Sequence, residues 1–213
     1  MHFRAIFGRE RDLEAGASDA LFRFRKRIFV DHLQWKLAVF DDRERDEFDR
    51  ADTLHCILFS GVEVAGAFRA IRTDQPYLAE TVFPTLAQIT PYPKRYDAWE
   101  VSRFGASTIH PSAPSLTFSL MFLFAQSVGL QSIVAITDPA FERAMRAFGI
   151  RTRRYGPPIP IGNDRRGRPL SGVAGEIILA AQSGTRFQKL LTHAHQIEVE
   201  DASDVLGRKR ISA

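Results

Sequence analysis

The segment over residues 99–105 constrains the fold most, because it carries charge where a buried strand should have none. Its aromatic and β-branched residues are typical of a strand, yet it contains Glu100 and Arg103. Alternation along a strand would place Glu100 and Ser102 on one face and Arg103 on the other. Because burying a charge without a partner costs several kcal/mol, both faces need oppositely charged neighbours. We therefore expect distant parts of the chain to supply charged partners for this strand.

The chain is long and apolar enough for one domain with a sizeable core. It has 213 residues, of which 45% are hydrophobic and 17 are phenylalanine, so it is not a disordered chain. We predict a single domain over residues 1–213, with a globular body over about 1–195 and a loose tail over 196–213. The net charge of +4 is mild and the basic residues are spread out, which argues against a nucleic-acid partner.

Three sequence features indicate a cytoplasmic protein without a membrane span. The single cysteine, Cys56, lies in an apolar run, so we expect a core residue and no internal disulfide. The first residues do not resemble a secretory signal. The longest apolar stretch, residues 116–130, contains polar side chains and is shorter than the ~20 residues that a spanning helix needs.

The order of the predicted elements indicates an α/β (α+β) sandwich built on one main sheet. Hydrophobic periodicity predicts helices at about 13–32, 114–128, 139–148 and 186–195, and a short amphipathic piece at 78–86. It predicts strands at about 3–7, 54–59, 63–73, 98–106, 132–137, 153–161 and 172–180. Residues 31–53 are dense in charge but include Trp35 and Phe48, so we expect a loop that folds back onto the body.

The familiar catalytic motifs are missing from the sequence. The histidines lack metal-ligand spacing, and there is neither a Gly-rich phosphate loop nor a Gly-x-Ser-x-Gly elbow. A metal site and an acyl-enzyme mechanism are therefore unsupported. What remains is a set of charged residues in apolar or aromatic segments: Asp46, Asp49, Glu100, Arg25, Arg69 and Arg103. They could form a structural ion-pair network, or they could line a pocket for a small molecule that carries both signs of charge.

The pattern of these residues resembles the LuxI-type autoinducer synthases, which make N-acyl-homoserine lactones from S-adenosylmethionine and an acyl-carrier-protein thioester. The matching positions, in the family's order and approximate spacing, are Arg25, Ile28, Phe29, Trp35, Asp46, Glu47, Phe48, Asp49, Arg69, Phe83, Pro84, Glu100, Val101, Ser102, Arg103 and Phe104. One departure is Arg72, where many members have a proline, and it affects a local turn. The resemblance implies an acetyltransferase-like fold, in which helices flank a mixed sheet that is splayed into a V.

The resemblance also implies roles for individual residues. The catalytic set would be Glu100, as the general base, with Ser102 and Arg103. S-adenosylmethionine would be bound by Arg25, Phe29, Trp35, Asp46, Asp49, Arg69 and Phe83, with acids on its cationic groups, arginine on its carboxylate and aromatic rings on its adenine or sulfonium. The acyl chain would lie against Phe104, Met121, Phe122 and Thr137, of which Thr137 is associated with 3-oxo chains in related enzymes. An acidic carrier protein would meet Arg151, Arg153 and Arg154. The reaction needs no metal and no cofactor, since S-adenosylmethionine is a substrate.

Three alternatives remain open at this point. The same reaction could use an acyl- or aryl-CoA donor. The chain could instead be an ordinary CoA-dependent N-acetyltransferase, but residues 103–107 do not match the Arg/Gln-x-x-Gly-x-Gly/Ala loop that holds the CoA pyrophosphate in that class. This mismatch favours a carrier-protein donor. Finally, the chain could be a small-molecule-binding module of the same fold, in which the charges are purely structural.

Overall fold

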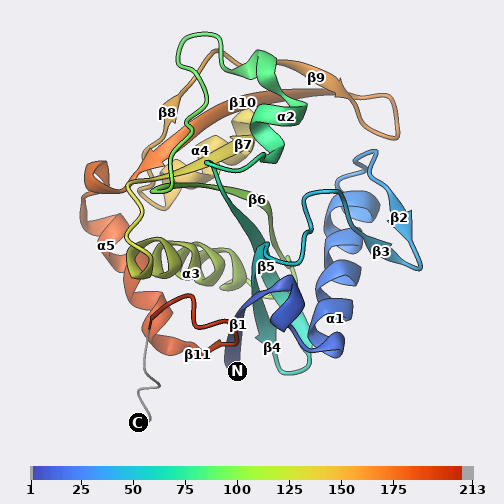
Figure 1. Ribbon diagram of the computed structural model, residues 1–213, viewed down its shortest axis with the longest axis vertical. Helices are drawn as coiled ribbons and strands as arrows, with labels where there is room; N and C mark the ends of the chain where they lie inside the picture. Colours follow the sequence, from blue (N-terminus) through green and yellow to red (C-terminus); the bar gives the residue numbers. More distant parts are fainter. Residues whose placement is uncertain (1, 208–213) are drawn as a thin grey trace.

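A nine-stranded mixed sheet organises residues 2–207, the part of the chain that the computed structural model describes (Figure 1). The sheet order is β11 (Glu198–Asp201), β1 (Phe3–Arg9), β4 (Leu54–Ser60), β5 (Glu63–Arg72), β6 (Ala98–Ala106), β7 (Ser132–Thr137), β10 (Pro169–Ile178) and β8 (Arg153–Arg154). Strand β9 (Ile159–Asn163) pairs with the first part of β10, so the single strand predicted over 153–161 is two strands. Cys56 is fully buried in β4, as predicted.

Helices cover both faces of the sheet. The long helix α3 (Ala113–Ser127) packs with α5 (Thr185–Thr192) on the face that contains Phe7 of β1. Helix α1 (Ala15–Arg25) packs on the opposite face, against Ile6 and Ile57. Two shorter helices lie near the other end of the sheet: α2 (Leu78–Val82) contacts β6, and α4 (Pro139–Ala147) contacts β10. Within residues 2–207, no helix is long and apolar enough to cross a membrane.

The predicted charged loop contains more local structure than the sequence indicated. After α1 the chain continues as a π-helical segment, Lys26–His32, so the helix predicted over 13–32 changes its pitch at residue 26. A small hairpin then forms from β2 (Val39–Phe40) and β3 (Arg43–Glu44). The loop does fold back onto the body, because Phe48 is only 4% exposed.

Strands β6 and β7 form the V that the resemblance predicts. They run parallel, but only Ala98–Glu100 and Ser132–Val134 are paired. Beyond those residues β6 stays on β5 and β7 stays on β10, so the two strands diverge toward their C-terminal ends. The prediction of a mixed, V-splayed sheet flanked by helices is therefore confirmed.

A bulge in β6 corrects the predicted direction of Arg103. This residue has a φ of 52°, and the register with β5 shifts where it lies. Val101, before the bulge, and Phe104, after it, both pack on the α3 side. Arg103 therefore points to the same side as Ser102, and the prediction that it faces away from Glu100 is wrong, because it assumed unbroken alternation along the strand.

The C-terminal segment forms a strand where the sequence predicted a loose tail. Strand β11 pairs in parallel with β1, and Leu206, just beyond it, is 3% exposed in the main core. The exposed acids Glu198 and Glu200 alternate along this strand and make the segment look like a solvated tail. Residues 208–213, the rest of the predicted tail, lie outside the described residues.

Leu206→Ala should lower the free energy of unfolding by about 2–5 kcal/mol, because it leaves a cavity in the core. The matched control is Glu200→Ala, which removes an exposed ion pair with Arg4 at 3.4 Å and should cost less than about 1 kcal/mol. Urea denaturation of both variants measures the difference. Equal and small effects would mean that the C-terminal segment does not belong to the core.

Candidate active site

A cavity of about 920 Å³ occupies the V between β6 and β7. Its polar part is lined by Ser102 and Arg103 of β6 and by Phe29 and Trp35, which follow α1. Its other part is apolar and runs between the sheet and helices α3 and α4. One space therefore offers a charged and aromatic region next to a hydrocarbon-lined region.

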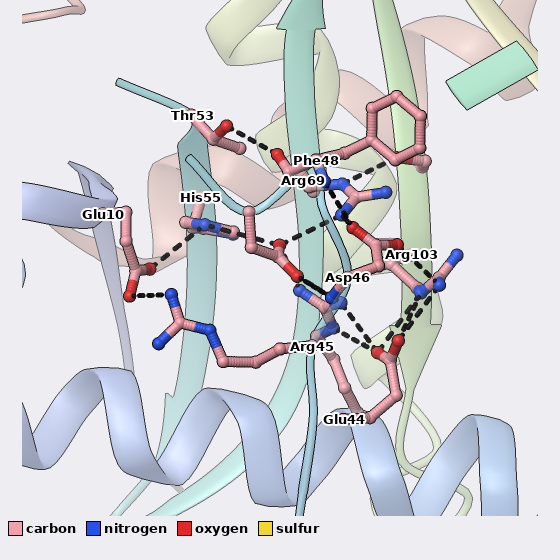
Figure 2. Close-up of polar contacts among 12 residues, drawn as sticks. Glu10, Glu44, Arg45, Asp46, Phe48, Thr53, His55, Arg69 and Arg103 are labelled. Carbon is pink, nitrogen blue, oxygen red and sulfur yellow. Dashed lines mark hydrogen bonds and ion pairs between the residues drawn. The ribbon is translucent and has the colours of Figure 1, made fainter. Parts of the chain in front are cut away.

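Three arginines and three carboxylates form an ion network beside the polar part of this cavity (Figure 2). The members are Arg25, Arg69, Arg103, Glu44, Asp46 and Asp49. At its centre, Nη1 and Nη2 of Arg25 donate to the two carboxylate oxygens of Asp49 at 2.7 and 2.9 Å. Nε of Arg25 donates to Glu44 Oε2 at 2.7 Å.

The inner part of the network is sealed from solvent. The side chains of Arg25, Glu44 and Asp49 are at most 1% exposed. Burial alone would raise the pKa of Asp49, but the guanidinium groups of Arg25 and Arg69 outweigh burial and hold that pKa below its ordinary value. These residues are paired with one another and do not line the cavity. They anchor the loop over residues 44–49 between α1 and the sheet.

The outer part of the network reaches the cavity. Nη2 of Arg103 donates to Glu44 at 3.0 Å and to Asp46 at 2.8 Å, and its Nε also points to Glu44. Among residues 2–207 its Nη1 has no hydrogen-bond partner, and this nitrogen is not fully buried. Arg103 can therefore bind a further anion without leaving the network.

Two aromatic rings complete the polar end of the cavity. Phe29 and Trp35 stack with their centroids 5.1 Å apart, and the Arg103 guanidinium lies 5.9 Å from the Phe29 centroid. A flat ligand or a soft cation could lie against such a surface. Phe29 is buried and Trp35 is half-buried, so the stack forms a wall rather than a mobile surface group.

Glu100 lies behind the cavity and not in its wall. It is 1% exposed, and its carboxylate accepts N–H bonds from Ala79 at 2.7 Å and Leu78 at 3.1 Å, at the start of α2. Burial raises the pKa of Glu100 to about 7, although the Ala79 N–H and Arg69 oppose the rise. Ser102, two residues further on the same face, does line the cavity, and it accepts a bond from Arg69 Nε at 3.0 Å.

A buried histidine extends the network away from the cavity. His55 Nε2 lies 3.3 Å from Glu10 and 4.0 Å from Asp49, and Glu10 also pairs with Arg45 at 3.0 Å. Burial lowers the pKa of His55 below its ordinary value, although Glu10 and Asp49 oppose the change. A neutral imidazole here leaves Asp49 to its arginine partners.

Two predicted aromatic residues lie outside the cavity, and its wall also lacks Glu100 and the network members Arg25, Asp46, Asp49 and Arg69. Phe83 packs at the end of α2 with Leu86, and Phe122 packs against Phe187 with ring centroids 4.8 Å apart. The structure therefore does not place Phe83 or Phe122 in the wall of the cavity, where the predicted roles in S-adenosylmethionine and acyl binding would require them. Helix α3 is apolar on all sides, so its sequence cannot tell which ring faces the cavity, and Phe118 is the one that does.

The other predicted acyl-pocket residues do line the cavity: Phe104, Met121 and Thr137. Sequence reasoning missed Phe141 and Met145, which also line it, because their four-residue spacing on α4 is equally typical of an ordinary core. It also missed Glu44. No signal separates Glu44 from the other acids of the same charged run.

The predicted carrier-protein patch is divided in the structure. Arg153 pairs with Glu176, and Arg154 pairs with Glu142, so their charges are largely balanced within the fold. Arg151 instead lines a separate surface groove with Arg146 and Arg186. The structure thus brings together three arginines of which only Arg151 was predicted.

Comparison with known proteins connects this site to a family. Residues 10–166 match the family model described as autoinducer synthase. An acyl-homoserine-lactone synthase from Acinetobacter nosocomialis is 32% identical over 168 residues, which cover 73% of this chain and 92% of that protein.

Two solved structures have the same fold. TofI, in a ternary complex with an inhibitor and MTA, is 27% identical with a TM-score of 0.73 and covers 87% of this chain and 96% of that one. BjaI, a CoA-dependent acyl-homoserine lactone synthase solved with SAM and isopentyl-CoA, is 20% identical with a TM-score of 0.78. That match covers 97% of this chain and 98% of the other.

The V-splayed sheet, with a cavity that joins polar and apolar parts, defines an acyltransferase of the acetyltransferase-like fold. The family match spans most of the chain, and the Acinetobacter relative is identical at about a third of the 168 matched residues. The chain belongs to the autoinducer synthase family, which confirms the resemblance seen in the sequence. It is an enzyme, an acyltransferase of the acyl-homoserine-lactone synthase type, and the products of such enzymes are quorum-sensing signals.

Proposed function

We propose that the enzyme transfers an acyl chain from acyl-carrier protein to the amine of S-adenosylmethionine and then closes the lactone, with release of methylthioadenosine. The observation that carries this proposal is the single cavity in which Arg103, Ser102 and the Phe29–Trp35 stack adjoin an apolar region. The ligands of TofI and BjaI, MTA and SAM, support the same choice of substrate. Both substrates are made in the cytoplasm, where we expect the enzyme to act.

Each charged group of S-adenosylmethionine has a suitable partner at the polar end. The free Nη1 of Arg103 suits the substrate carboxylate. Asp46, whose side chain is 14% exposed, is the most open carboxylate of the network and suits the ammonium group. Phe29 and Trp35 suit the adenine or the sulfonium. In this proposal Arg25, Asp49 and Arg69 act one step further away, by holding Asp46 and Arg103.

The ammonium must lose a proton before its nitrogen can attack the thioester carbonyl. We assign Glu100 as the base because a pKa of about 7 suits proton transfer near neutral pH. Residues two apart on a strand are roughly 7 Å apart, so the proton would pass through Ser102 or a water beside it. Ser102 already accepts a bond from Arg69, which leaves its own hydroxyl proton free to donate.

The acylation step forms a C–N bond and breaks the thioester C–S bond. The carrier thiol leaves with a proton, and backbone N–H groups of β6 that no longer pair with β7 suit the oxyanion. In the second step the substrate carboxylate attacks the carbon attached to sulfur, and the neutral thioether departs. No metal or cofactor is needed, because the sulfonium is already a good leaving group and the protein mainly positions it.

The apolar end of the cavity suits the acyl chain, with Phe104, Met121 and Thr137 in contact with it. A carrier-protein donor is favoured over CoA because residues 103–107 lack a pyrophosphate loop. The groove around Arg151 also suits an acidic carrier. The second candidate is an acyl- or aryl-CoA donor, and the CoA-dependent BjaI is the observation that favours it.

Reversing two charges in this groove should affect the carrier and not the chemistry. The double variant Arg151→Glu/Arg186→Glu should raise the KM for acyl-carrier protein roughly tenfold at low salt, with kcat nearly unchanged. A double reversal at Arg4 and Arg11, exposed arginines of the N-terminal segment, serves as the control. The KM values are obtained from initial rates measured against carrier concentration. Equal KM values for both double variants would mean that the carrier protein does not bind in this groove.

The function itself is tested by product analysis. The purified protein is incubated with S-adenosylmethionine and either acyl-carrier protein or acyl-CoA, and methylthioadenosine and lactone are measured by mass spectrometry. We expect both products with the carrier donor. Acetyl transfer without methylthioadenosine would indicate an N-acetyltransferase, and binding without products would indicate a binding module.

A further inference from the structure

One hydrogen bond joins the two halves of the chain at the polar end of the cavity. The backbone N–H of Arg165 donates to the backbone oxygen of Gln34 at 2.7 Å. Arg165 lies in the turn between β9 and β10, and Gln34 follows the π-helical segment after α1. In Figure 1 this turn reaches across to the loop between the helix and β2. The contact is therefore made by parts of the chain that are far apart in sequence.

The bond acts on the peptide group that carries Trp35. The C=O of Gln34 and the N–H of Trp35 belong to one planar unit. Its C=O accepts from Arg165, and its N–H donates to the Phe29 oxygen at 2.8 Å. Because both polar ends of the unit are held, its rotation is restrained and the backbone at Trp35 is fixed, from which the ring stacks on Phe29 with an angle of 22° between the rings.

Gln34 needs an outside partner to keep this geometry. Its φ is 60°, in the left-handed region that residues other than glycine seldom adopt. Such a conformation persists only where surrounding contacts hold it. The Arg165 N–H is one such contact, so its loss would allow this segment to relax and Trp35 to leave the cavity wall.

The turn that presents the donor is itself firmly built. The carboxylate of Asp164, which is 1% exposed, accepts backbone N–H bonds from Arg166 at 2.9 Å and Arg168 at 2.8 Å, and Arg168 Nε at 2.7 Å. The Gly167 N–H closes the β-turn onto the Asp164 oxygen at 3.1 Å, with Gly167 at a φ of 77°. The turn holds its shape without Gln34 and so offers a fixed donor to it.

We propose that the β9–β10 turn is a positioning element for the substrate site, in which Asp164 shapes the turn and the Arg165 N–H fixes Trp35 against Phe29. The ligand affected, S-adenosylmethionine, rests on the proposed function. Arg165 and Asp164 touch no reacting atom and are positioning residues. A single neutral hydrogen bond corresponds to about 2- to 12-fold in a binding constant. We expect loss of the bond between Arg165 and Gln34 to weaken S-adenosylmethionine binding by this factor.

Two substitutions at one position test the bond separately from the side chain. Arg165→Pro removes the N–H, and proline suits the second position of such a turn. Arg165→Ala removes the charged side chain but keeps the N–H. We expect the KM for S-adenosylmethionine to rise about 2- to 12-fold in Arg165→Pro, with kcat within about twofold, and to stay within about twofold in Arg165→Ala. Equal KM values for both variants would overturn the proposal.

Two measurements do not depend on turnover. In a Trp99→Phe background the emission reports Trp35 alone, and Arg165→Pro should change it while Arg165→Ala should not. In the wild-type protein the Arg165 amide should exchange slowly with solvent, and exchange as fast as that of an exposed loop amide would overturn the proposal even if Arg165→Pro fails to fold. If the wild type makes no methylthioadenosine, the proposed function fails, while emission and exchange still decide whether the turn positions Trp35.

Discussion

Glu100→Gln should slow acylation by about 10²- to 10⁴-fold, because the amide cannot take over the proposed role of Glu100 as acceptor of the proton from the substrate amine. Burial raises the pKa of Glu100 to about 7, so the carboxylate is protonated and inactive at lower pH. The wild-type rate should therefore rise as the pH passes through about 7. Glu100→Gln should lose this dependence. Single-turnover measurements of acyl transfer at several pH values report both effects.

A second variant separates the proposed catalytic role of Glu100 from its structural role. Glu100 also holds the start of α2, so its replacement could act through that helix. Leu78→Pro removes the N–H that bonds to Glu100 Oε2 but leaves the carboxylate, and proline is tolerated at the first position of a helix. We expect Leu78→Pro to lower the Tm while the pH dependence persists. A folded Glu100→Gln variant with an unchanged rate would assign Glu100 to the anchoring of α2 alone.

Arg25→Met should lower the free energy of unfolding by about 3–5 kcal/mol, because it leaves Glu44 and Asp49 buried without their shared partner. The matched control is Arg23→Met on the same helix. Arg23 pairs with Asp19 and Asp42 at the surface, and its loss should cost less than about 1 kcal/mol. Urea denaturation of the two variants measures both costs.

Neutralising Asp49 as well should restore part of the stability lost in Arg25→Met. Arg25→Met/Asp49→Asn should be more stable than the sum of the two single costs predicts, because the pair is removed together. Strict additivity, or equal costs for Arg25→Met and Arg23→Met, would mean that solvent reaches the inner network in solution.

The charged residues of the site could be found in the sequence because they interrupt apolar segments. Arg69 lies on a buried strand, and Arg25 on the flank of an apolar helical stripe, where a charge requires a partner. The V-splayed sheet followed from the family resemblance together with the order of the elements. Periodicity also located β6 and α3 to within a residue or two.

The remaining features depend on tertiary geometry that periodicity does not encode. The bulge at Arg103 reverses which face its neighbours occupy, and no residue in that strand signals it. Glu44 is one acid among several, and only the fold brings it to Arg25 and Arg103. Strand β11 has a polar sequence because one of its faces meets solvent, so its pairing with β1 was hidden.

The ion network has equal numbers of positive and negative groups, and this balance affects how readily the nucleoside product dissociates. In the proposed function S-adenosylmethionine offers its carboxylate to Arg103 and its cationic groups to Asp46, so both signs of charge in the network bind it at once. The nucleoside that departs after lactone closure has lost the sulfonium, the ammonium and the carboxylate. In the proposed reaction this nucleoside retains only the contacts assigned above to Phe29 and Trp35, so the reaction itself removes the attractions that would otherwise delay its dissociation.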